Sequence, residues 1–265
     1  MKESLTIKVV QPDIWMLTPL DHARVQLALC AYGAGLAHDK VNKQFKVEQY
    51  GMEPGMSPDI GLPVELMNEF DEVDIKDYSN AEDLIRRLIG MKPEPHESVE
   101  EHSAISFLIR CSRIGSHEIV RHRHMGITQR STRYCKEKDV ITFIKPPHYP
   151  DSDLGTYLFS VDENYMLIAT DPTDAPDWLV SSVYSLVGYQ RELDNGVKRE
   201  SARYLLPHDL LVWIQITPGF RELRSILKLR CNPPAAPEMN RIFRKAHTLT
   251  TQISPILTSD IIIEG

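Results

Sequence analysis

The sequence is poor in cysteine and contains no long apolar run. Only four of its 265 residues are cysteines; they lie far apart and form no C-x-x-C pair, at positions Cys30, Cys111, Cys135 and Cys231. Neither a disulfide framework nor a cysteine zinc site is therefore predicted, and we expect four reduced thiols and no bound metal. No stretch approaches the roughly eighteen consecutive apolar residues of a membrane span. The first residues, MKESLTIKVV, lack the basic and apolar segments of a signal peptide. These absences predict a cytoplasmic protein without membrane contact.

Positive charge is also scarce overall. The chain has 30 Lys and Arg residues against 37 Asp and Glu residues, which gives a formal net charge of −7. A general nucleic-acid-binding function is not expected of such a chain, because phosphate backbones attract basic surfaces. With 42% hydrophobic and 25% charged residues, the composition is that of a folded, soluble protein long enough for a substantial core.

The positive charge that is present gathers in one segment. Residues 110–138 hold eight Lys and Arg residues and two Glu residues, a local charge of +6, so the other 236 residues carry −13. Residues 53–101 hold fourteen carboxylates and four cations. Arginines gathered in an acidic protein repel one another unless something negative offsets them, so the segment predicts a site for a small anion.

Periodicity and capping residues predict intermixed helices and strands. Alternating or continuous apolar residues predict strands over residues 5–10, 103–109, 139–144 and 210–216. Helical spacing predicts helices over residues 20–34, 81–89, 177–193, 199–206, 220–229 and 238–252. A further helix is expected to begin at Ser112 or Ser116 and run towards Arg121, whereas residues 39–63 are rich in Gly, Pro and Met and predict a long loop. No boundary divides the chain, so we expect a single α+β domain over residues 1–265, with an insertion-like segment at about 39–93.

Three known motifs are incomplete. His117 and His122 are spaced five apart, whereas the zinc motif H-E-x-x-H spaces its histidines four apart on one helix face. Gly33-Ala-Gly35 lacks the third glycine of a dinucleotide-binding turn. Cys135 has basic neighbours, but no histidine and carboxylate can be paired with it, so we interpret it as a structural thiol.

The basic segment contains a pattern suited to anions. Arg121-His122-Arg123 is followed by seven residues and then Ser131-Thr132-Arg133. Guanidinium groups pair bidentately with phosphate, and in an extended segment Ser131 and Arg133 would share a face. The residues alone leave two interpretations open: a solvated basic loop, or an anion-binding site.

This pattern resembles the R-H-R-x7-S motif of the flavin-dependent thymidylate synthases, the ThyX family. The resemblance extends to Ser98, Glu101 and His102 upstream, and to two downstream segments at residues 199–207 (RESARYLLP) and 227–230 (LKLR). Ungapped agreement covers roughly half of the chain, from residue 95 to 134 and from 198 to about 246.

The resemblance implies a fold and an activity. Such proteins have an α+β fold with a central, mostly antiparallel sheet flanked by helices, and assemble as homotetramers with shared active sites. They bind FAD, are reduced by NADPH, and transfer a methylene group from 5,10-methylenetetrahydrofolate to C5 of dUMP. Hydride from the flavin completes the methyl group of dTMP, and no cysteine attacks the base.

Site residues follow from the same resemblance. The catalytic residues implied are Arg230, which would face the pyrimidine and favour ionisation at N3, and Ser131. The residues implied to bind the cofactor are Ser98, Arg121, His122, Arg123, Gln129, Gly219, Arg221 and Ser225. The residues implied to bind the nucleotide are Glu118, Arg121, Gln129, Arg130, Ser131, Thr132, Arg133, Arg203 and Arg230.

The chain departs from the family pattern at several of these positions. Gly126, Thr128 and Gln129 replace Ser, Asn and Glu, while Glu118 replaces a glutamine; Glu118 and Gln129 therefore look like an exchanged pair. Gly219 and Ser225 replace asparagines. We therefore expect a divergent thymidylate synthase. The alternatives are methylation or hydroxymethylation of another pyrimidine nucleotide (UMP or dCMP, or dUMP to a hydroxymethyl product) and a catalytically silent nucleotide-binding relative.

Overall fold

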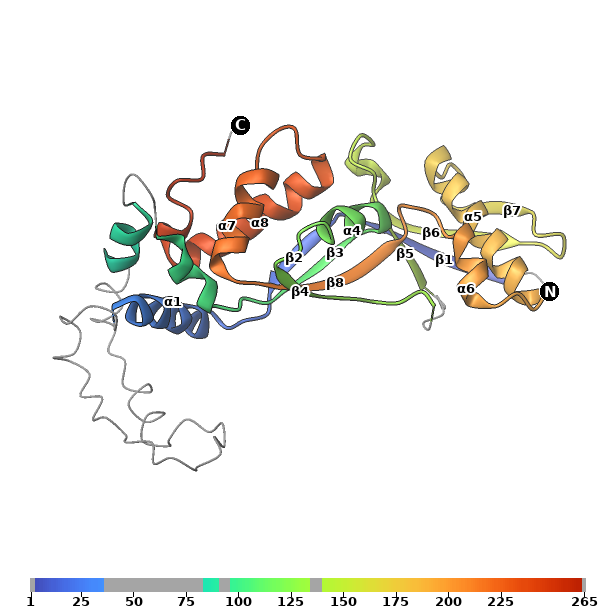
Figure 1. The fold of residues 1–265 in the computed structure, drawn as a ribbon. Helices are drawn as coiled ribbons and strands as arrows, with labels where there is room; N and C mark the ends of the chain where they lie inside the picture. The colour runs from blue at the N-terminus through green and yellow to red at the C-terminus, as the bar shows by residue number, and fades with distance from the viewer. Residues whose placement is uncertain (1–2, 36–82, 91–95, 134–139, 264–265) are drawn as a thin grey trace, which may run out of the picture.

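The protein is elongated and contains two four-stranded sheets that lie one after the other along its length (Figure 1). The structure, a computed structural model, describes residues 3–35, 83–90, 96–133 and 140–263. Sheet A has the order β5-β1-β6-β7 and sheet B the order β2-β3-β8-β4. The expected single central sheet is therefore corrected to two sheets, and the fold is mixed α+β.

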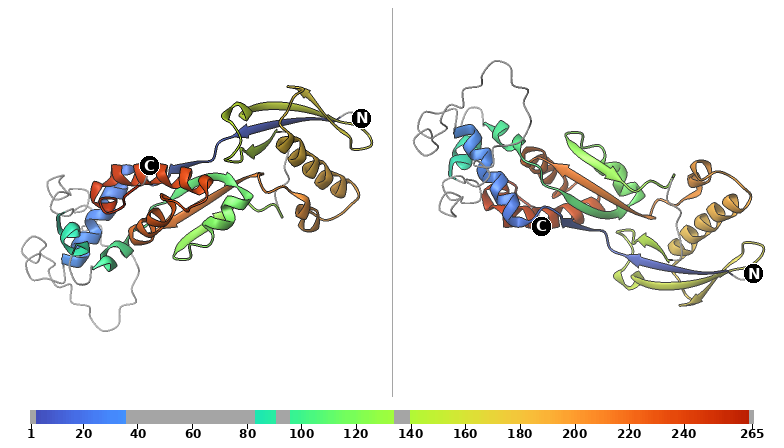
Figure 2. Two further views of the ribbon diagram at one scale, coloured as in Figure 1. Left: turned by 90° about the horizontal axis from the view of Figure 1, so that it is seen from above. Right: turned by 90° about the horizontal axis from the view of Figure 1, so that it is seen from below.

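Sheet A lies at the N-terminal end of the molecule. It consists of β1 (Glu3–Val10), β5 (Val140–Ile144), β6 (Gly155–Val161) and β7 (Leu167–Asp171). Only the pair β1 and β5 is parallel. Helix α5 (Asp177–Asp194) lies beside this sheet, followed by the short helix α6 (Arg199–Ala202) (Figure 2). Leu179, Val183 and Leu186 of α5 pack with Phe159 and Phe143 in one hydrophobic cluster.

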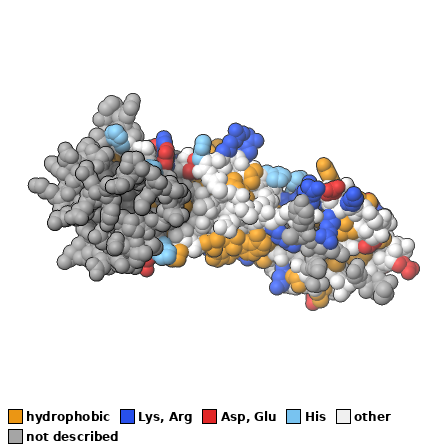
Figure 3. Space-filling view, turned by 60° about the horizontal axis from the view of Figure 1, so that its bottom comes forward, with side chains coloured by type: hydrophobic (Ala, Val, Ile, Leu, Met, Phe, Trp, Pro, Cys, Tyr) orange, Lys and Arg blue, Asp and Glu red, His pale blue; other side chains and the backbone are white. Residues whose placement is uncertain are grey.

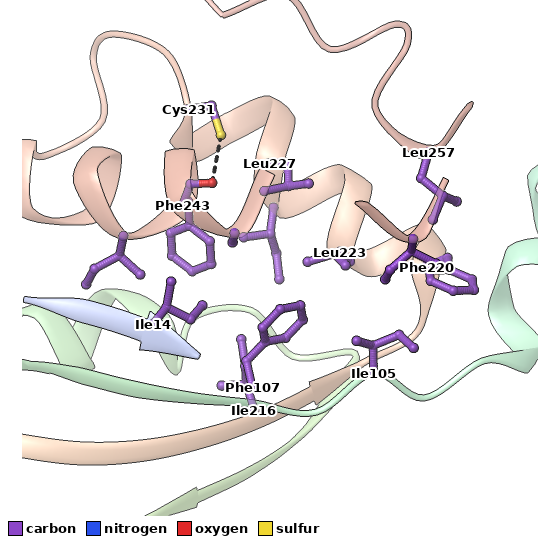
Figure 4. Close-up of a cluster of buried hydrophobic side chains, with 14 of the residues drawn as sticks. Ile14, Ile105, Phe107, Ile216, Phe220, Leu223, Leu227, Cys231, Phe243 and Leu257 are labelled. Atoms are coloured by element: carbon purple, nitrogen blue, oxygen red, sulfur yellow. Dashed lines mark hydrogen bonds between the residues drawn. The ribbon is translucent and has the colours of Figure 1, made fainter. Parts of the chain in front are cut away.

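Sheet B is entirely antiparallel and carries the larger hydrophobic cluster. It consists of β2 (Asp13–Met16), β3 (Phe107–Ser112), β4 (Met125–Gln129) and β8 (Leu211–Pro218). Helices α1 (Leu20–Gly35), α7 (Phe220–Arg230) and α8 (Pro237–Ile253) complete this half. Figure 4 shows Phe107 and Ile216 of the sheet pointing towards Leu223, Leu227 and Phe243 of α7 and α8.

The two sheets are joined where their strands meet. Phe143 of β5 forms an isolated antiparallel bridge with Leu210, which directly precedes β8. The backbone N–H of Ile144 donates to Asp209 O at 2.8 Å, and that of Lys145 donates to Val10 O at 2.9 Å. Because β8 begins at this junction, residues 199–210 of the sheet A half lie against the start of sheet B.

Most of the predicted elements are confirmed. Strands β1, β5 and β8 and helices α1, α5, α7 and α8 lie within a few residues of their predicted bounds. The predicted helix at residues 199–206 is α6 continued by the 3-10 turn η3 (Arg203–Leu205). Residues 83–89 are helical and Gly90 follows in a turn, as expected. The long loop predicted at 39–63 and Cys135 lie outside the described residues.

The strand predicted at residues 103–109 begins later, at Phe107. Its first residues bond to other parts of the fold: the backbone N–H of Ala104 donates to Gln26 Oε1 at 2.7 Å, and that of Ser106 donates to Thr18 Oγ1 at 2.9 Å. Ser103 Oγ accepts from the backbone N–H of Phe220 at 2.7 Å. An apolar run does not reveal such partners, so the prediction placed the strand too early.

Strands β2, β4, β6 and β7 were not predicted. Strand β4 has the sequence MGITQ, in which only Met125 and Ile127 pack against the hydrophobic cluster. It becomes a strand because it pairs with β8, from Met125 opposite Pro218 to Gln129 opposite Ile214. A short, polar edge strand of this kind depends on its partner more than on its own sequence.

One face of sheet B is not covered by the helices of the described residues and carries apolar side chains, which Figure 3 shows towards the middle of the molecule. Trp15 of β2 and Trp213 of β8 have ring centroids 5.7 Å apart, and Arg110 lies 5.3 Å from the centre of the Trp15 ring. Trp15 is 36% exposed and Leu17 is 46% exposed. Of the helices in the described ranges, none has the length and apolar character needed to span a bilayer.

Candidate functional site

Helix α4 (Arg113–Ile119) is the element around which the predicted site residues gather. Its N-cap is Ser112, whose Oγ accepts from the backbone N–H of Gly115 at 2.9 Å. Ser112 is held in turn by Glu238 of α8, which accepts from the Ser112 backbone N–H at 2.7 Å and from Ser112 Oγ at 2.6 Å. Burial raises the pKa of Glu238. The beginning of α4 is therefore fixed to α8 by a buried carboxylate.

The other end of α4 is held by α7. Arg230, the last residue of α7, donates through Nη1 to Glu118 Oε2 at 2.6 Å and through Nη2 to the backbone oxygen of Glu118 at 3.3 Å. The backbone oxygen of Glu118 also accepts from the backbone N–H of Arg121 at 3.3 Å, and a positively charged guanidinium at the C-terminal end of a helix interacts favourably with the helix dipole. Arg230 and Glu118 are both partly buried. The structure therefore brings two of the predicted nucleotide-binding residues into contact.

His122 joins the same group. Arg230 Nε donates to His122 Nε2 at 3.3 Å, while His122 Nδ1 lies 3.8 Å from Glu222 Oε1. Burial, followed by the positive charge of Arg230, lowers the pKa of His122. The ring is therefore neutral near pH 7 and, because Nε2 accepts, carries its proton on Nδ1, facing Glu222.

A pocket of about 330 Å³, hereafter the arginine pocket, opens beside α4. Three arginines line it, and they come from separate parts of the chain: Arg113, Arg130 and Arg203. Its other polar lining residues are His117, Gln129, Ser131 and Thr132. None of the described lining residues is acidic, so the pocket has the charge expected of an anion site.

The arginine pocket contains five of the residues predicted to bind the nucleotide, which are Gln129, Arg130, Ser131, Thr132 and Arg203. Arg133 lies elsewhere: it lines a neighbouring pocket of about 650 Å³, and its Nη2 is 3.0 Å from Glu200 Oε2. Residues 132 and 133 form a turn instead of an extended strand. The alternating-face argument for Ser131 and Arg133 therefore does not apply, and only Ser131 lines the arginine pocket.

A larger pocket of about 690 Å³, hereafter the acidic pocket, lies between α7 and the 3-10 turn η1 (Glu97–His102). Three predicted cofactor-binding residues line it: Gly219, Arg221 and Ser225. Its charged lining consists of four carboxylates and three cations: Glu97, Glu100, Glu101, Glu222, Arg221, Arg224 and Lys228. Arg221 is ion-paired with Glu101 and lies 3.6 Å from Glu97.

Gly219 has a structural reason to lack a side chain. A Cβ at this position would lie 3.2 Å from Ser103 O and 3.4 Å from the backbone oxygens of Glu100 and Glu101. These close approaches let η1 lie against the beginning of α7. The replacement of the family's asparagine therefore accompanies a close backbone contact at the edge of the acidic pocket.

Glu100 is the most deeply buried carboxylate in the acidic pocket, with an exposed fraction of 0%. Its Oε2 is 3.1 Å from Arg224 Nε, but neither of its oxygens accepts a hydrogen bond from the described residues. Arg224 is shared with Asp260, whose Oδ2 is 3.0 Å from Nη2. Burial therefore outweighs the attraction of Arg224 and raises the pKa of Glu100 to about 7.

The remaining predicted cofactor-binding residues lie at the surface. Arg121 lies in the turn after α4, and Arg123 follows two residues later; both are exposed, without an ion pair among the described residues. Ser98 is exposed on η1, the turn that also carries Glu97 and Glu101. Gly126 and Thr128, which were noted only as departures from the family pattern, lie on the edge strand β4, where both are exposed.

Glu118 and Gln129, interpreted as an exchanged pair, have different partners. Glu118 binds Arg230, whereas Gln129 Nε2 donates to Ser116 Oγ at 3.3 Å. Arg230 belongs to α7 and Ser116 to α4, and within the described residues no contact joins the side chains of Glu118 and Gln129. The replacement at 118 therefore places a carboxylate next to Arg230, and the replacement at 129 places an amide in the arginine pocket.

The three described cysteines are buried and free. Burial raises the pKa of Cys30 and of Cys231 to about 11, and also raises that of Cys111. A buried thiol with a raised pKa is a poor nucleophile, because the thiolate is the reactive form. These cysteines belong to the hydrophobic cluster of sheet B and not to either pocket.

The sequence did not identify Arg113 or Glu238 as site residues. Arg113 stands directly after the N-cap Ser112 and four residues before His117, a spacing that places both on one face of a helix. This spacing was the one sequence feature that could have indicated Arg113 as a site residue. Glu238 gave none, because its partner Ser112 lies 126 residues away.

Known proteins resemble the chain in sequence. Residues 61–256 match the family model described as thymidylate synthase complementing protein. A flavin-dependent thymidylate synthase of Thermococcus onnurineus (strain NA1) is 32% identical over 136 residues, which are 51% of this chain and 49% of that protein. One of Mycobacterium bovis (strain BCG / Pasteur 1173P2) is 28% identical over 172 residues, covering 62% and 64%. The matched region thus spans about half the length of the first of these relatives.

The fold has a known counterpart. The crystal structure of the UMP/dUMP methylase PolB from Streptomyces cacaoi, bound with 5-Br dUMP, superposes with a TM-score of 0.59 at 17% identity, covering 95% of each chain. This likeness concerns the fold. The family match, by contrast, extends over more than half of the sequence, and it shows that the chain belongs to the thymidylate synthase complementing protein family.

Proposed function

We propose that the protein is a flavin-dependent thymidylate synthase, which methylates dUMP at C5 to give dTMP. The carbon would come from 5,10-methylenetetrahydrofolate. One observation carries the proposal: residues of two motifs about seventy positions apart, Gln129 to Thr132 and Arg203, line one arginine-rich pocket. Its volume of about 330 Å³ falls within the range of roughly 300–1,000 Å³ usual for ligand pockets.

The nucleotide would lie between the arginine pocket and Arg230. Arg203 and Ser131 offer a cation and a hydroxyl for its phosphate. Arg230 would face the pyrimidine and stabilise the anion formed when N3 loses its proton, because a fixed positive charge in a partly buried site lowers the energy of a developing negative charge. By holding the phosphate, Ser131 would position the base beside Arg230.

FAD is the cofactor that we propose, and the described residues fit it in part. The acidic pocket has room for flavin rings, and its carboxylates could accept hydrogen bonds from hydroxyl and amino groups. Its cations are ion-paired, so the diphosphate would be bound by Arg121 and Arg123, with Ser98 adding a hydroxyl. His122, Gln129, Gly219, Arg221 and Ser225 complete the proposed contacts. When bound and reduced, the flavin supplies the hydride that completes the methyl group.

Several finer features belong to this proposal. NADPH would reduce the cofactor, the chain would act as one domain in the cytoplasm, and four copies would assemble with shared active sites. The apolar open face of sheet B, with Trp15 and Trp213, supports assembly because an uncovered apolar face is typical of an interface. Light scattering of the purified protein would give its mass in solution.

The test is an assay with the complete set of proposed reactants. Purified protein is incubated with FAD, NADPH, 5,10-methylenetetrahydrofolate and dUMP labelled with tritium at C5. We expect a yellow protein, release of tritium, and dTMP as the product by mass spectrometry. Protein that takes up no FAD and releases no tritium would refute the proposal and would instead agree with a silent nucleotide-binding relative.

The same assay examines other pyrimidine nucleotides. The structurally similar methylase is described as acting on UMP and dUMP, so UMP and dCMP are tested beside dUMP. We expect dUMP to react fastest, and a hydroxymethyl product would be recognised by its mass. Arg230→Ala should reduce turnover by about a hundredfold or more, the usual loss of one charge-stabilising group, while dUMP binding is only weakened.

A further inference from the structure

The arginine pocket contains two guanidinium groups that lie close together without a described counter-charge. Arg113 is the first residue of α4, and Arg203 begins η3. Neither has an ion pair among the described residues, although both line the same pocket. Burial, followed by the charge of Arg203, lowers the pKa of Arg113. Like charges held together in this way are stabilised when an anion binds between them.

The backbone keeps the two groups together despite their repulsion. Arg113 Nη1 donates to the backbone oxygen of Leu206 and to that of Pro207 at 3.4 Å. Arg203 Nε donates to the backbone oxygen of Glu200 at 3.2 Å. The three accepting carbonyls belong to one short segment, residues 200–207. Each guanidinium is therefore anchored through a single nitrogen.

The anchoring leaves other donors of both groups available. Nε and Nη2 of Arg113 and both Nη groups of Arg203 have no partner among the described residues. A guanidinium with two free donor nitrogens can bind a phosphate bidentately, and the positive charges of two guanidinium groups together balance a dianion. The hydroxyl groups of Ser131 and Thr132 line the same pocket and can donate to the remaining phosphate oxygens.

Arg133, the cation implied by the family motif, is engaged elsewhere. Its Nη2 lies 3.0 Å from Glu200 Oε2, and it lines the neighbouring pocket. We infer that Arg113 binds the phosphate of the nucleotide together with Arg203, and so takes the part that the motif assigns to Arg133. This inference deepens the proposed function and rests on it for the identity of the base, but not for the phosphate.

The experiment separates the phosphate from the base. Calorimetry measures the binding of three probes: dUMP, deoxyuridine, and 2-deoxyribose 5-phosphate. For Arg113→Gln we expect the affinity for dUMP and for 2-deoxyribose 5-phosphate to fall by about tenfold to a hundredfold, the range for a lost hydrogen bond to a charged group. The affinity for deoxyuridine should not change. Arg113→Lys, which keeps the charge but loses the planar fork, should give a smaller loss for the same two probes.

Arg24 provides a matched control. It also donates to two backbone oxygens, those of Gln252 at 3.1 Å and Ile253 at 3.4 Å, and it does not line the arginine pocket. Arg24→Gln should leave all three affinities unchanged. Arg133→Gln should weaken dUMP binding less than Arg113→Gln does. Thermal unfolding shows whether each variant is folded. If Arg113→Gln does not fold, the affinities of Arg113→Lys for the same probes provide the test.

The possible results are distinct. The inference is overturned if the wild-type protein does not bind 2-deoxyribose 5-phosphate. It is also overturned if Arg113→Gln lowers the affinity for deoxyuridine as much as the affinity for dUMP. A third contrary result is that only Arg133→Gln lowers the affinity for 2-deoxyribose 5-phosphate. If the phosphate probe binds through Arg113 but no nucleotide is methylated, the inference holds and the proposed function fails. If dUMP is methylated and Arg113→Gln binds it normally, the function holds and the inference fails.

Discussion

Arg230 and Glu118, which are 112 residues apart in the sequence, form a hydrogen-bonded ion pair of 2.6 Å that joins the end of α7 to the end of α4. The resemblance assigns Arg230 to the pyrimidine and a glutamine to position 118. In this chain a carboxylate therefore neutralises part of the charge that would face the base. Arg230 also contacts His122, and His122 in turn lies near Glu222, which lines the acidic pocket.

Replacing Glu118 by glutamine should strengthen nucleotide binding. Glu118→Gln keeps an oxygen that can accept from Arg230 but removes a negative charge that opposes a bound anion. The affinity for dUMP should rise about two- to fivefold, because a partly exposed ion pair contributes up to about 1 kcal/mol. Isothermal calorimetry measures the change, with the exposed Glu163→Gln as the control. Weaker binding by Glu118→Gln would show that the carboxylate assists the nucleotide.

Glu118 and Gln129 should act independently in the ligand-free protein. Their side chains have different partners, Arg230 and Ser116. The free energies of unfolding of Glu118→Gln, Gln129→Glu and the double variant should therefore add within about 0.5 kcal/mol. Urea denaturation of the four proteins gives the coupling energy. A coupling above about 1 kcal/mol would instead support the interpretation of a compensating pair.

Gly115→Ala should destabilise the protein even though alanine favours helices. A Cβ at Gly115 would lie 2.7 Å from Glu238 Oε1 and 2.8 Å from Met239 Cε. Glu238 is held by Ser112 and Met239 is buried, so neither can move without loss. Overpacking of this kind costs about 1–3 kcal/mol, more than the roughly 1 kcal/mol that helix propensity returns.

Gly126→Ala is the matched control for this substitution. The nearest atom to a Cβ there is Thr217 Cβ at an ordinary 3.7 Å, so its free energy of unfolding should change by no more than about 0.5 kcal/mol. Urea denaturation measures both variants. Equal changes in the free energy of unfolding at the two positions would show that the hydrogen bonds between Glu238 and Ser112 do not limit the space beside α4.

Glu100 should make the stability of the protein depend on pH. Its carboxyl pKa is raised from an ordinary 4.5 to about 7, chiefly by burial, in the presence of Arg224, Glu97, Asp260 and Lys228. The folded state thus holds the proton more tightly than the unfolded state. This contribution is fully present below about pH 4.5 and is lost as the pH rises through about 7.

Between these two pH values the free energy of unfolding should fall by on the order of 3 kcal/mol, which is the pKa shift of Glu100 converted into free energy. Urea denaturation of the wild-type protein and of Glu100→Gln at several pH values tests the prediction. The variant cannot ionise at this position, so its stability should vary less over the range. A wild-type slope that persists unchanged in Glu100→Gln would assign the pH dependence to other groups.

The helices and the longer strands could be predicted because their signals are local. Leu179, Val183 and Leu186 recur at helical spacing, and α5 is a helix with that face buried. Ser112 was one of two candidate caps, and it is the residue that caps α4. Strand β4 and the division into two sheets could not be predicted, because both depend on pairing with strands far away in the sequence.

The candidate site divides in the same way. The amino-acid sequence by itself determined the basic segment, the acidic surroundings and the motifs that place the chain in its family, since these are properties of residue type and spacing. Only the tertiary structure decided which charges meet. It paired Arg230 with Glu118 and Arg133 with Glu200, and it left Arg113 beside Arg203 in a pocket without a described acid. Charge attraction acts through space over a few ångströms, so the partner of each arginine is set by the packing of α4, α7 and residues 200–207.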